Sequence, residues 1–176
     1  MLGFTKSSIV LALIFCLAEA AALPASAQLD VDSLVIPGPG LPKPSELGLT
    51  VEDLTKPVPE LEHLLVRERL EKRFDAQCWR DRKCNFNDAN NCFNYLRGLG
   101  HTNCVADRRT VGMCQAGPCV WWGRPINGNA GYASSYCEDV AWGGAWVINN
   151  CKDSNKLFSG ANAANGNGNF IVEIHT

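Results

Sequence analysis

The sequence lacks most of the short motifs that indicate a particular chemistry. Its 176 residues include only three histidines, and its cysteines form no Cys-x-x-Cys pair, which argues against a zinc site. There is no Gly-x-Ser-x-Gly motif of a serine hydrolase, and no Gly-rich loop followed by Lys-Ser or Lys-Thr to bind phosphate. No Asn-x-Ser/Thr sequon is present, so ordinary N-glycosylation is not expected. We therefore expect neither a metal nor a cofactor.

An excess of charge of either sign is also missing. The 16 lysine and arginine residues nearly balance the 18 aspartate and glutamate residues, so strong attraction to nucleic acid is not expected. Beyond residue 27, no apolar run is long enough to cross a membrane. The composition therefore predicts a product that is released and that does not bind nucleic acid.

Residues 1–27 have the three parts of a secretory signal peptide. Lys6 provides the positive charge, residues 9–17 form a short apolar run, and residues 25–27 (Ala-Ser-Ala) fit the small-x-small rule for cleavage. The apolar run is too short for a membrane anchor. Removal of the signal also removes Cys16 and leaves eight cysteines, an even number suited to disulfides in an oxidising secretory route.

Residues 28–73 contain no cysteine, and we expect them to be a largely disordered pro-segment. Six prolines before residue 60 remove backbone donors and disfavour long helices and sheets. Residues 61–72 have leucines at near-helical spacing and predict a short amphipathic helix. This helix would either cover an apolar surface of the following domain or serve as a spacer, and the spacer is favoured.

The dipeptide Lys72-Arg73 separates two unlike parts of the chain. Residues 28–73 carry nine acidic and six basic residues, whereas residues 74–176 carry eight acidic and nine basic residues and all eight remaining cysteines. A dibasic pair at such a change of composition is typical of a processing site. The sequence Leu-Glu-Lys-Arg resembles the kexin-type sites of fungal pro-proteins, in which the cut follows the arginine. That resemblance implies a kexin-type protease as a partner during secretion, a fungal source, and a mature domain over residues 74–176.

The eight cysteines after residue 73 predict four disulfides, each of which typically contributes about 2–4 kcal/mol by restricting the unfolded chain. Eight cysteines allow on the order of a hundred pairings, and the sequence does not choose among them. The cysteines are Cys78, Cys84, Cys92, Cys104, Cys114, Cys119, Cys137 and Cys151.

Two helices are expected in the mature domain. The first has one apolar face, is capped by Asn87 or Asp88, and ends at Gly98 or Gly100. Its apolar face consists of Ala89, Cys92, Phe93 and Leu96.

The second helix is expected to begin at a capping box. In this motif the Ser135 oxygen accepts a hydrogen bond from the backbone N–H of Glu138, and the Glu138 carboxylate reaches back. An apolar stripe then continues to Cys151. The pair Gly143-Gly144 is expected to weaken this helix and to bend or interrupt it.

Strands are expected around these helices, in the order β-α-β-β-α-β. An Asn- and Gly-rich stretch at residues 162–169 predicts a tight loop into the last strand. The order predicts an α+β, two-layer, ferredoxin-like sandwich with a four-stranded antiparallel sheet and both helices on one face. Cys92 and Cys137 lie on the inward helical stripes and are expected to bridge to the sheet. The expected strands are residues 77–80, 105–114, 119–122 and 170–174.

Three further stretches carry a family resemblance: residues 88–96 (DANNCFNYL), 134–141 (SSYCEDVA) and 163–172 (AANGNGNFIV). Together with the signal, the pro-segment and the eight cysteines, they resemble the killer-toxin-like and necrosis-inducing small secreted effectors of filamentous fungi. The resemblance covers the mature domain and is one of pattern, without a catalytic motif. It implies secretion to act on a host or a competitor, and it does not name the molecular target.

The tryptophans are the candidate ligand contacts. Trp121 and Trp122 are adjacent on an expected strand, so one is expected to face outward if the other packs inward. Trp142 and Trp146 are four residues apart on the second helix and are expected to lie together. Exposed rings would stack on sugars or contact a membrane interface, whereas buried rings would fill the core, which is the favoured interpretation.

A small, ribonuclease-like hydrolase is a further interpretation. It would need acid–base groups and cations that contact phosphate. Two of the candidates, Glu173 and His175, are expected to share one face of the last strand. A terminal strand and a solvated loop are the favoured interpretation. The full candidate set is Glu173, His175, His101, Arg108 and Arg109.

The sequence therefore predicts a secreted effector or toxin-like protein that binds a host or competitor protein, glycan or membrane without catalysis. The alternatives are a carbohydrate- or cell-wall-binding module that uses the tryptophans, and the small secreted hydrolase.

Overall fold

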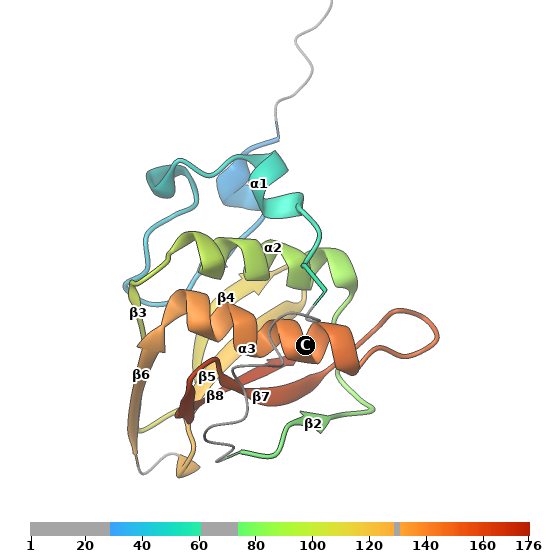
Figure 1. Cartoon of the computed structure of the whole chain (residues 1–176). Coiled ribbons are helices and arrows are strands. Elements are labelled where there is room, and N and C mark those ends of the chain that lie inside the picture. The colour runs from blue at the N-terminus through green and yellow to red at the C-terminus, as the bar shows by residue number, and fades with distance from the viewer. Residues whose placement is uncertain (1–28, 61–73, 129–130) are drawn as a thin grey trace, which may run out of the picture.

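The computed structural model describes residues 29–60, 74–128 and 131–176. The expected signal peptide, the residue 61–72 helix and the Lys72-Arg73 pair lie outside these ranges. Within them the chain forms an α+β fold in which two long helices pack on one face of a six-stranded sheet (Figure 1). All pairings between its described strands are antiparallel.

The strand order of the large sheet is β1-β4-β5-β8-β7-β2, and β3 and β6 form a separate two-stranded sheet. The expected four-stranded, ferredoxin-like layout is therefore not confirmed. The strands are β1 (Ile36–Pro37), β2 (Gln77–Cys78), β3 (Asn103–Asp107), β4 (Val111–Ala116), β5 (Cys119–Pro125), β6 (Tyr132–Tyr136), β7 (Gly160–Ala164) and β8 (Asn167–His175).

Two local features explain the difference. The expected strand over residues 105–114 is split at Arg108, whose φ of 52° turns the chain between β3 and β4, and these two strands belong to different sheets. The stretch expected as a loop at residues 162–169 instead forms the hairpin of β7 and β8, with Gly166 at a φ of 69° in the turn. Only this short turn keeps the expected loop character.

The first long helix is α2 (Phe86–Gly98). Its expected apolar face is confirmed, because Ala89, Cys92, Phe93 and Leu96 are all fully buried. The cap is Asn85 rather than Asn87 or Asp88: the Asn85 Oδ1 atom accepts a hydrogen bond from the Asp88 backbone N–H at 2.9 Å. The helix ends at Gly98 as expected.

The second long helix is α3 (Cys137–Asn150), and the expected capping box is wrong. Ser135 belongs to strand β6, and the N-cap residue Tyr136 makes no side-chain capping bond. The helix also runs without interruption through Gly143 and Gly144. These glycines allow close packing on the sheet, since a Cβ atom would collide with the Ala163 carbonyl at Gly143 and with the Trp121 ring at Gly144.

Replacement of Gly144 by alanine is expected to lower the free energy of unfolding by about 1–3 kcal/mol, because the added methyl group overpacks the buried Trp121 ring. Gly112→Ala is the matched control, since a Cβ there meets atoms only at ordinary contact distances of 3.6 Å or more. Denaturant unfolding of both variants tests this. Equal stability of the two would show that helix α3 shifts freely on the sheet.

Four disulfides join the elements, as expected, and such a set is typical of extracellular proteins. Cys92 on α2 bridges to β4 of the large sheet, as expected, whereas Cys137 on α3 bridges to β3 of the separate small sheet. The pairs are Cys78–Cys151, Cys84–Cys119, Cys92–Cys114 and Cys104–Cys137.

Residues 29–60, which we call the N-terminal segment, are ordered, contrary to the expectation of a largely disordered pro-segment. Val35, Leu54 and Val58 are buried in the same core as residues 74–176. The prolines still keep every element short. The segment contains two 3₁₀ turns (Val31–Ser33 and Ser45–Leu47), strand β1 and helix α1 (Val51–Thr55).

Candidate functional site

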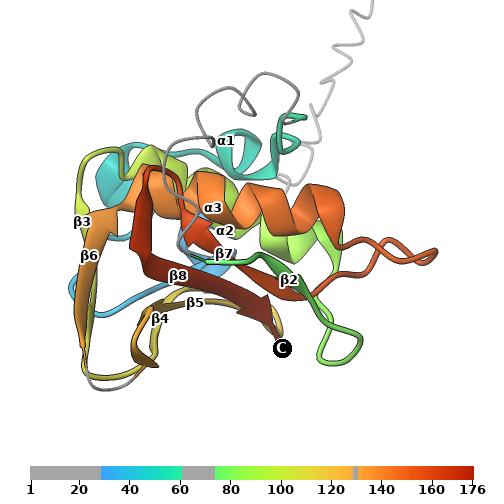
Figure 2. The ribbon, with the colours of Figure 1, turned by 60° about the horizontal axis from the view of Figure 1, so that its bottom comes forward.

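The face of the large sheet that points away from the helices carries aromatic and charged side chains. Figure 2 shows α2 and α3 on one side of the sheet and no described helix on the other. Trp121 points toward α3. Trp122 and Arg124 come one and three residues later on β5, so their side chains point to the opposite face. The side chains on and beside this face form what we call the sheet-face cluster: Phe74, Trp79, Trp122, Arg124, Glu173 and His175.

Glu173 lies at the centre of the charged part of this cluster. The Arg124 Nε atom donates a hydrogen bond to Glu173 Oε1 at 2.5 Å, and His175 Nε2 lies 3.9 Å from Glu173 Oε2. The expectation that Glu173 and His175 share a face is therefore confirmed. The Arg124–Glu173 pair is largely shielded from solvent, where charge-assisted hydrogen bonds are strong. The arginine thus holds the carboxylate in a fixed ion pair.

The aromatic part of the cluster is organised around His175. Its ring stacks on Trp122 with 5.8 Å between centroids and an interplanar angle of 22°, and it lies 5.6 Å from the tilted ring of Trp79. Beside them, the Arg124 guanidinium sits 5.7 Å from the centre of the Phe74 ring, a cation–π contact. Phe74 is the first residue of the expected mature domain.

The structure separates the four candidate tryptophans. Trp121 is fully buried and fills the core, whereas Trp122 is half-buried on the helix-free face, as the alternation predicts. Trp142 and Trp146 are half-buried and pack against the core, and Trp142 meets Phe93 of α2 edge-on at 5.3 Å. Of the four, only Trp122 belongs to the sheet-face cluster.

The small sheet of β3 and β6 presents a second surface, which we call the tyrosine ridge: Val105, Tyr132 and Tyr136. These are exposed large apolar side chains, with 65% of Tyr132 and 46% of Tyr136 accessible. Val105 is on β3 and the two tyrosines on β6, which pair from Asn103↔Tyr136 to Asp107↔Tyr132. Alternation places all three on the same outer face. An exposed apolar group of this kind is typical of an interaction surface.

One end of the tyrosine ridge makes contacts with neighbouring elements. His101 stacks on Tyr136 with 4.7 Å between ring centres, and its Nε2 atom lies 2.8 Å from Glu138 Oε1. The Cys104–Cys137 disulfide joins β3 to the start of α3 behind this end. The disulfide therefore fixes the position of this end of the small sheet relative to α3.

The hydrolase candidates are not brought together as one site. His101 pairs with Glu138 beside the tyrosine ridge, whereas Glu173 and His175 belong to the sheet-face cluster. Arg108 and Arg109 follow β3, and the Arg108 Nε atom lies 3.9 Å from Asp107. The arginine that pairs with Glu173 is Arg124, which the sequence interpretation missed. Arg124 is two residues after Trp122 on the same strand, so the two side chains share a face.

Tyr132 and Tyr136 were also missing from the sequence candidates. The signal that would have found them is their spacing, because tyrosines four residues apart on one strand share a face.

Among the described residues there is no group of three or more histidine, cysteine or acidic side chains that could hold a metal ion. No helix in the same residues is both long and apolar enough to span a bilayer.

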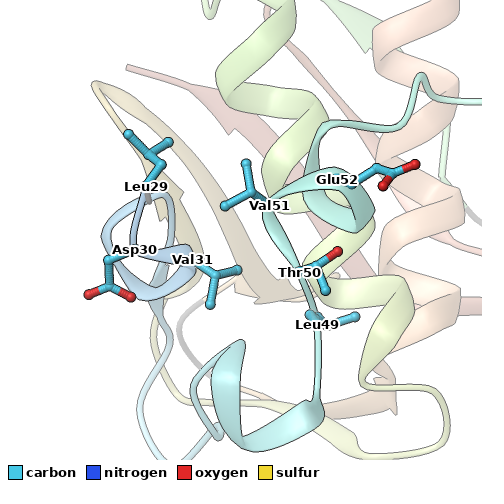
Figure 3. A pocket seen from close by; sticks show the side chains of 7 residues that line it. All are labelled: Leu29, Asp30, Val31, Leu49, Thr50, Val51 and Glu52. Carbon is cyan, nitrogen blue, oxygen red and sulfur yellow. The ribbon is translucent and has the colours of Figure 1, made fainter. Parts of the chain in front are cut away.

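A pocket lies within the N-terminal segment, between residues 29–31 and 49–52. Figure 3 shows that Asp30 and Glu52 direct their carboxylates to opposite sides, away from each other. Its lining offers no pair of acid–base groups within reach of one substrate atom. The pocket therefore does not add a catalytic site.

Comparisons with known proteins give a family but no activity. A family model described as a domain of unknown function (DUF8794) matches residues 71–176, which contain the sheet-face cluster, the tyrosine ridge and all four disulfides. No curated protein and no solved structure matches the chain. Because the match covers more than half of the 176 residues, the chain belongs to the DUF8794 family.

Proposed function

We propose that this protein is a secreted fungal effector or killer-toxin-like protein, processed after Arg73 by a kexin-type protease, that acts by binding a host or competitor molecule. The four disulfides support an oxidising destination. The signal-like residues 1–27 and the Lys72-Arg73 pair support export and processing.

The observation that carries the proposal is the tyrosine ridge. Three exposed apolar side chains share one face of a two-stranded sheet that a disulfide joins to α3, and two of them are tyrosines, which are enriched at interfaces. A protein with no other role for this face would gain solubility from polar residues there. The ridge is therefore the surface on which we place the partner.

The ion pair between Glu173 and Arg124 favours binding over hydrolysis. Glu173 is engaged by Arg124 at 2.5 Å, and the other histidine candidate, His101, pairs with Glu138 elsewhere on the surface. A carboxylate that accepts from an arginine is less available to take a proton from a substrate. The geometry of the cluster thus supports a structural or ligand-contacting role for these residues.

Replacement of Tyr132 by alanine is expected to shift the dose response of cell death or growth arrest at least tenfold, because a central aromatic anchor typically accounts for about 2 kcal/mol or more of binding. The assay applies purified secreted protein to host and competitor cells. Leu29→Ala is the control, since it truncates a comparably exposed side chain (57%) outside the family domain. If Tyr132→Ala is as potent as the wild type and unfolds at the same denaturant concentration, the ridge takes no part in the mechanism.

A second candidate function, carbohydrate or cell-wall binding, is supported by Trp122. Its half-buried ring lies on the helix-free face beside His175 and Trp79, and flat aromatic faces stack on sugar rings. Loss of chitin or glycan-array binding in Trp122→Ala, with binding retained in the helix-layer variant Trp142→Ala, would favour this function over the first.

A further inference from the structure

The N-terminal segment lies mainly on two elements of the family domain, helix α2 and strand β4, and Asn149 of α3 also donates to its Pro59 carbonyl oxygen at 3.4 Å. Figure 1 shows the segment, in blue to cyan, against α2. Residues 28–73 contain no cysteine, so none of the four disulfides includes this segment. A cut after Arg73 would therefore leave only non-covalent contacts between the two parts.

The first set of contacts is strand addition at β4. Ile36 pairs with Gln115 and Pro37 with Cys114, and the Gly38 backbone N–H donates to the Met113 carbonyl oxygen at 2.9 Å. A Cβ atom at Gly38 would lie 2.5 Å from the Gly112 carbonyl oxygen and under 3.0 Å from Met113 backbone atoms. The fit at this edge therefore requires glycine.

The second set consists of donors on α2 that bind main-chain carbonyls of the segment. The Tyr95 hydroxyl donates to the Pro42 carbonyl oxygen at 2.7 Å. The Asn94 Nδ2 atom donates to the carbonyl oxygens of Leu54 at 2.9 Å and Lys56 at 2.6 Å. Tyr95 and Asn94 are both buried beneath the segment. We call this surface of α2 and β4, beneath the N-terminal segment, the groove. Because it binds backbone oxygens, it is suited to an extended peptide.

The segment is also preorganised for this surface. The Asp32 carboxylate accepts hydrogen bonds from the Ser45 backbone N–H at 2.9 Å and from its hydroxyl at 2.7 Å, which closes a loop of the segment on itself. Thr50 and Asp53 form a reciprocal capping box at the start of α1. Internal bonds of this kind reduce the entropy lost on binding.

We infer that residues 29–60 stay bound after the cut as a second, non-covalent chain seated between α2 and β4. This inference rests on the processing at Lys72-Arg73 that belongs to the proposed function. The mature protein is then a two-chain complex, and the segment is a subunit of it. The partner that this groove fits is its own N-terminal segment, held by β-strand addition and by main-chain carbonyl binding.

The test cuts the purified full chain and asks whether the fragments separate. The cut is made with a kexin-type protease, or at a site-specific protease sequence put in place of residues 70–73. Size-exclusion chromatography in native buffer, followed by intact mass without reduction, is expected to find both fragments in one peak, and to separate them in urea. Elution of a free segment in native buffer, with a folded residue 74–176 fragment by circular dichroism, would overturn the inference.

Two variants make the test specific to the groove. Gly38→Ala removes the strand fit and Asn94→Ala removes two carbonyl hydrogen bonds, and each is expected to weaken retention of the cut segment at least tenfold on dilution. Asn155→Ala is the control, because Asn155 is exposed and its bond to Asp153 is made by the backbone N–H, which alanine keeps. If Asn94→Ala and Gly38→Ala retain the segment as wild type does, the groove is not what holds it.

The outcomes are independent of the assay for the proposed function. Co-elution of the fragments together with a fully active Tyr132→Ala variant would support the two-chain form and reject the tyrosine ridge. Separate fragments together with an inactive Tyr132→Ala variant would do the reverse. A secreted chain that is uncut in cells would reject processing, while the cut made in vitro still measures the strength of the groove.

Discussion

Replacement of Leu54 by alanine is expected to lower the free energy of unfolding by about 2–5 kcal/mol. Leu54 lies on α1, is fully buried, and packs in the core shared with α2, although it is outside the family match at residues 71–176. Removal of its side chain leaves a cavity that neighbouring residues fill only in part, and the loss of apolar contact adds to that cost. Denaturant unfolding of the uncut chain measures the effect.

Leu29→Ala is the matched control for Leu54. The same atoms are removed from a side chain that is 57% exposed, and a change within about 0.5 kcal/mol is expected. If the two variants unfold at the same denaturant concentration, the N-terminal segment is not part of the folding unit. The large difference that we expect would show instead that the cooperative unit extends beyond the family domain.

Removal of the Cys92–Cys114 disulfide by alanine at both positions is expected to cost about 2–5 kcal/mol. The bridge closes a loop of 22 residues and joins α2 to β4. Both elements also hold the N-terminal segment, so we expect hydrogen exchange at the Gly38 amide, which donates to Met113, to become faster relative to amides of α3.

The Cys78–Cys151 pair provides the comparison. It joins β2 to the end of α3, away from α2 and β4, where the segment is met by one longer hydrogen bond, from Asn149 Nδ2 to the Pro59 carbonyl oxygen at 3.4 Å. Its double alanine variant is also expected to be less stable. In that variant we expect hydrogen exchange at the Gly38 amide to become faster by no more than exchange at the amides of α3. Equal acceleration at Gly38 in the two double variants would mean that the segment responds to global stability and not to the bridge beneath it.

The sequence was informative where periodicity is set by burial. The apolar face of α2, the outward position of Trp122 next to buried Trp121, and the shared face of Glu173 and His175 all follow from spacing, and all are found. The bridges from Cys92 and Cys137 to strands follow from the same helical stripes. These features depend on local geometry alone.

Strand β7 was missed because its small residues are required by close packing against helix α3, which is distant in the sequence. Its residues are small, and at Ala163 the backbone lies against Gly143 of α3, where larger side chains would prevent contact. Small residues without an apolar alternation indicate a loop when the sequence is considered alone. The strand is specified by close helix–sheet packing, which local propensity does not record.

The order of the N-terminal segment was missed for a related reason. Val35, Leu54 and Val58 are its buried anchors. Leu54 and Val58 are four residues apart, but Pro57 lies between them and Val35 lies 19 residues earlier, so they form no sustained periodic pattern. Its prolines were correctly taken to exclude long elements, but short turns and a two-residue strand are compatible with them. The buried donors on α2, Asn94 and Tyr95, are the partners that order it.

Both borders of the large sheet are closed by strands of only two residues, β1 on one side and β2 on the other. Proline at position 37 leaves β1 unable to extend a continuous ladder to a further chain. A protein produced without residues 29–60 would present β4 as a bare border with unpaired amides and carbonyls. We therefore expect such a truncated product to self-associate through β4 and to form oligomers or fibres at concentrations where the longer chain remains dispersed.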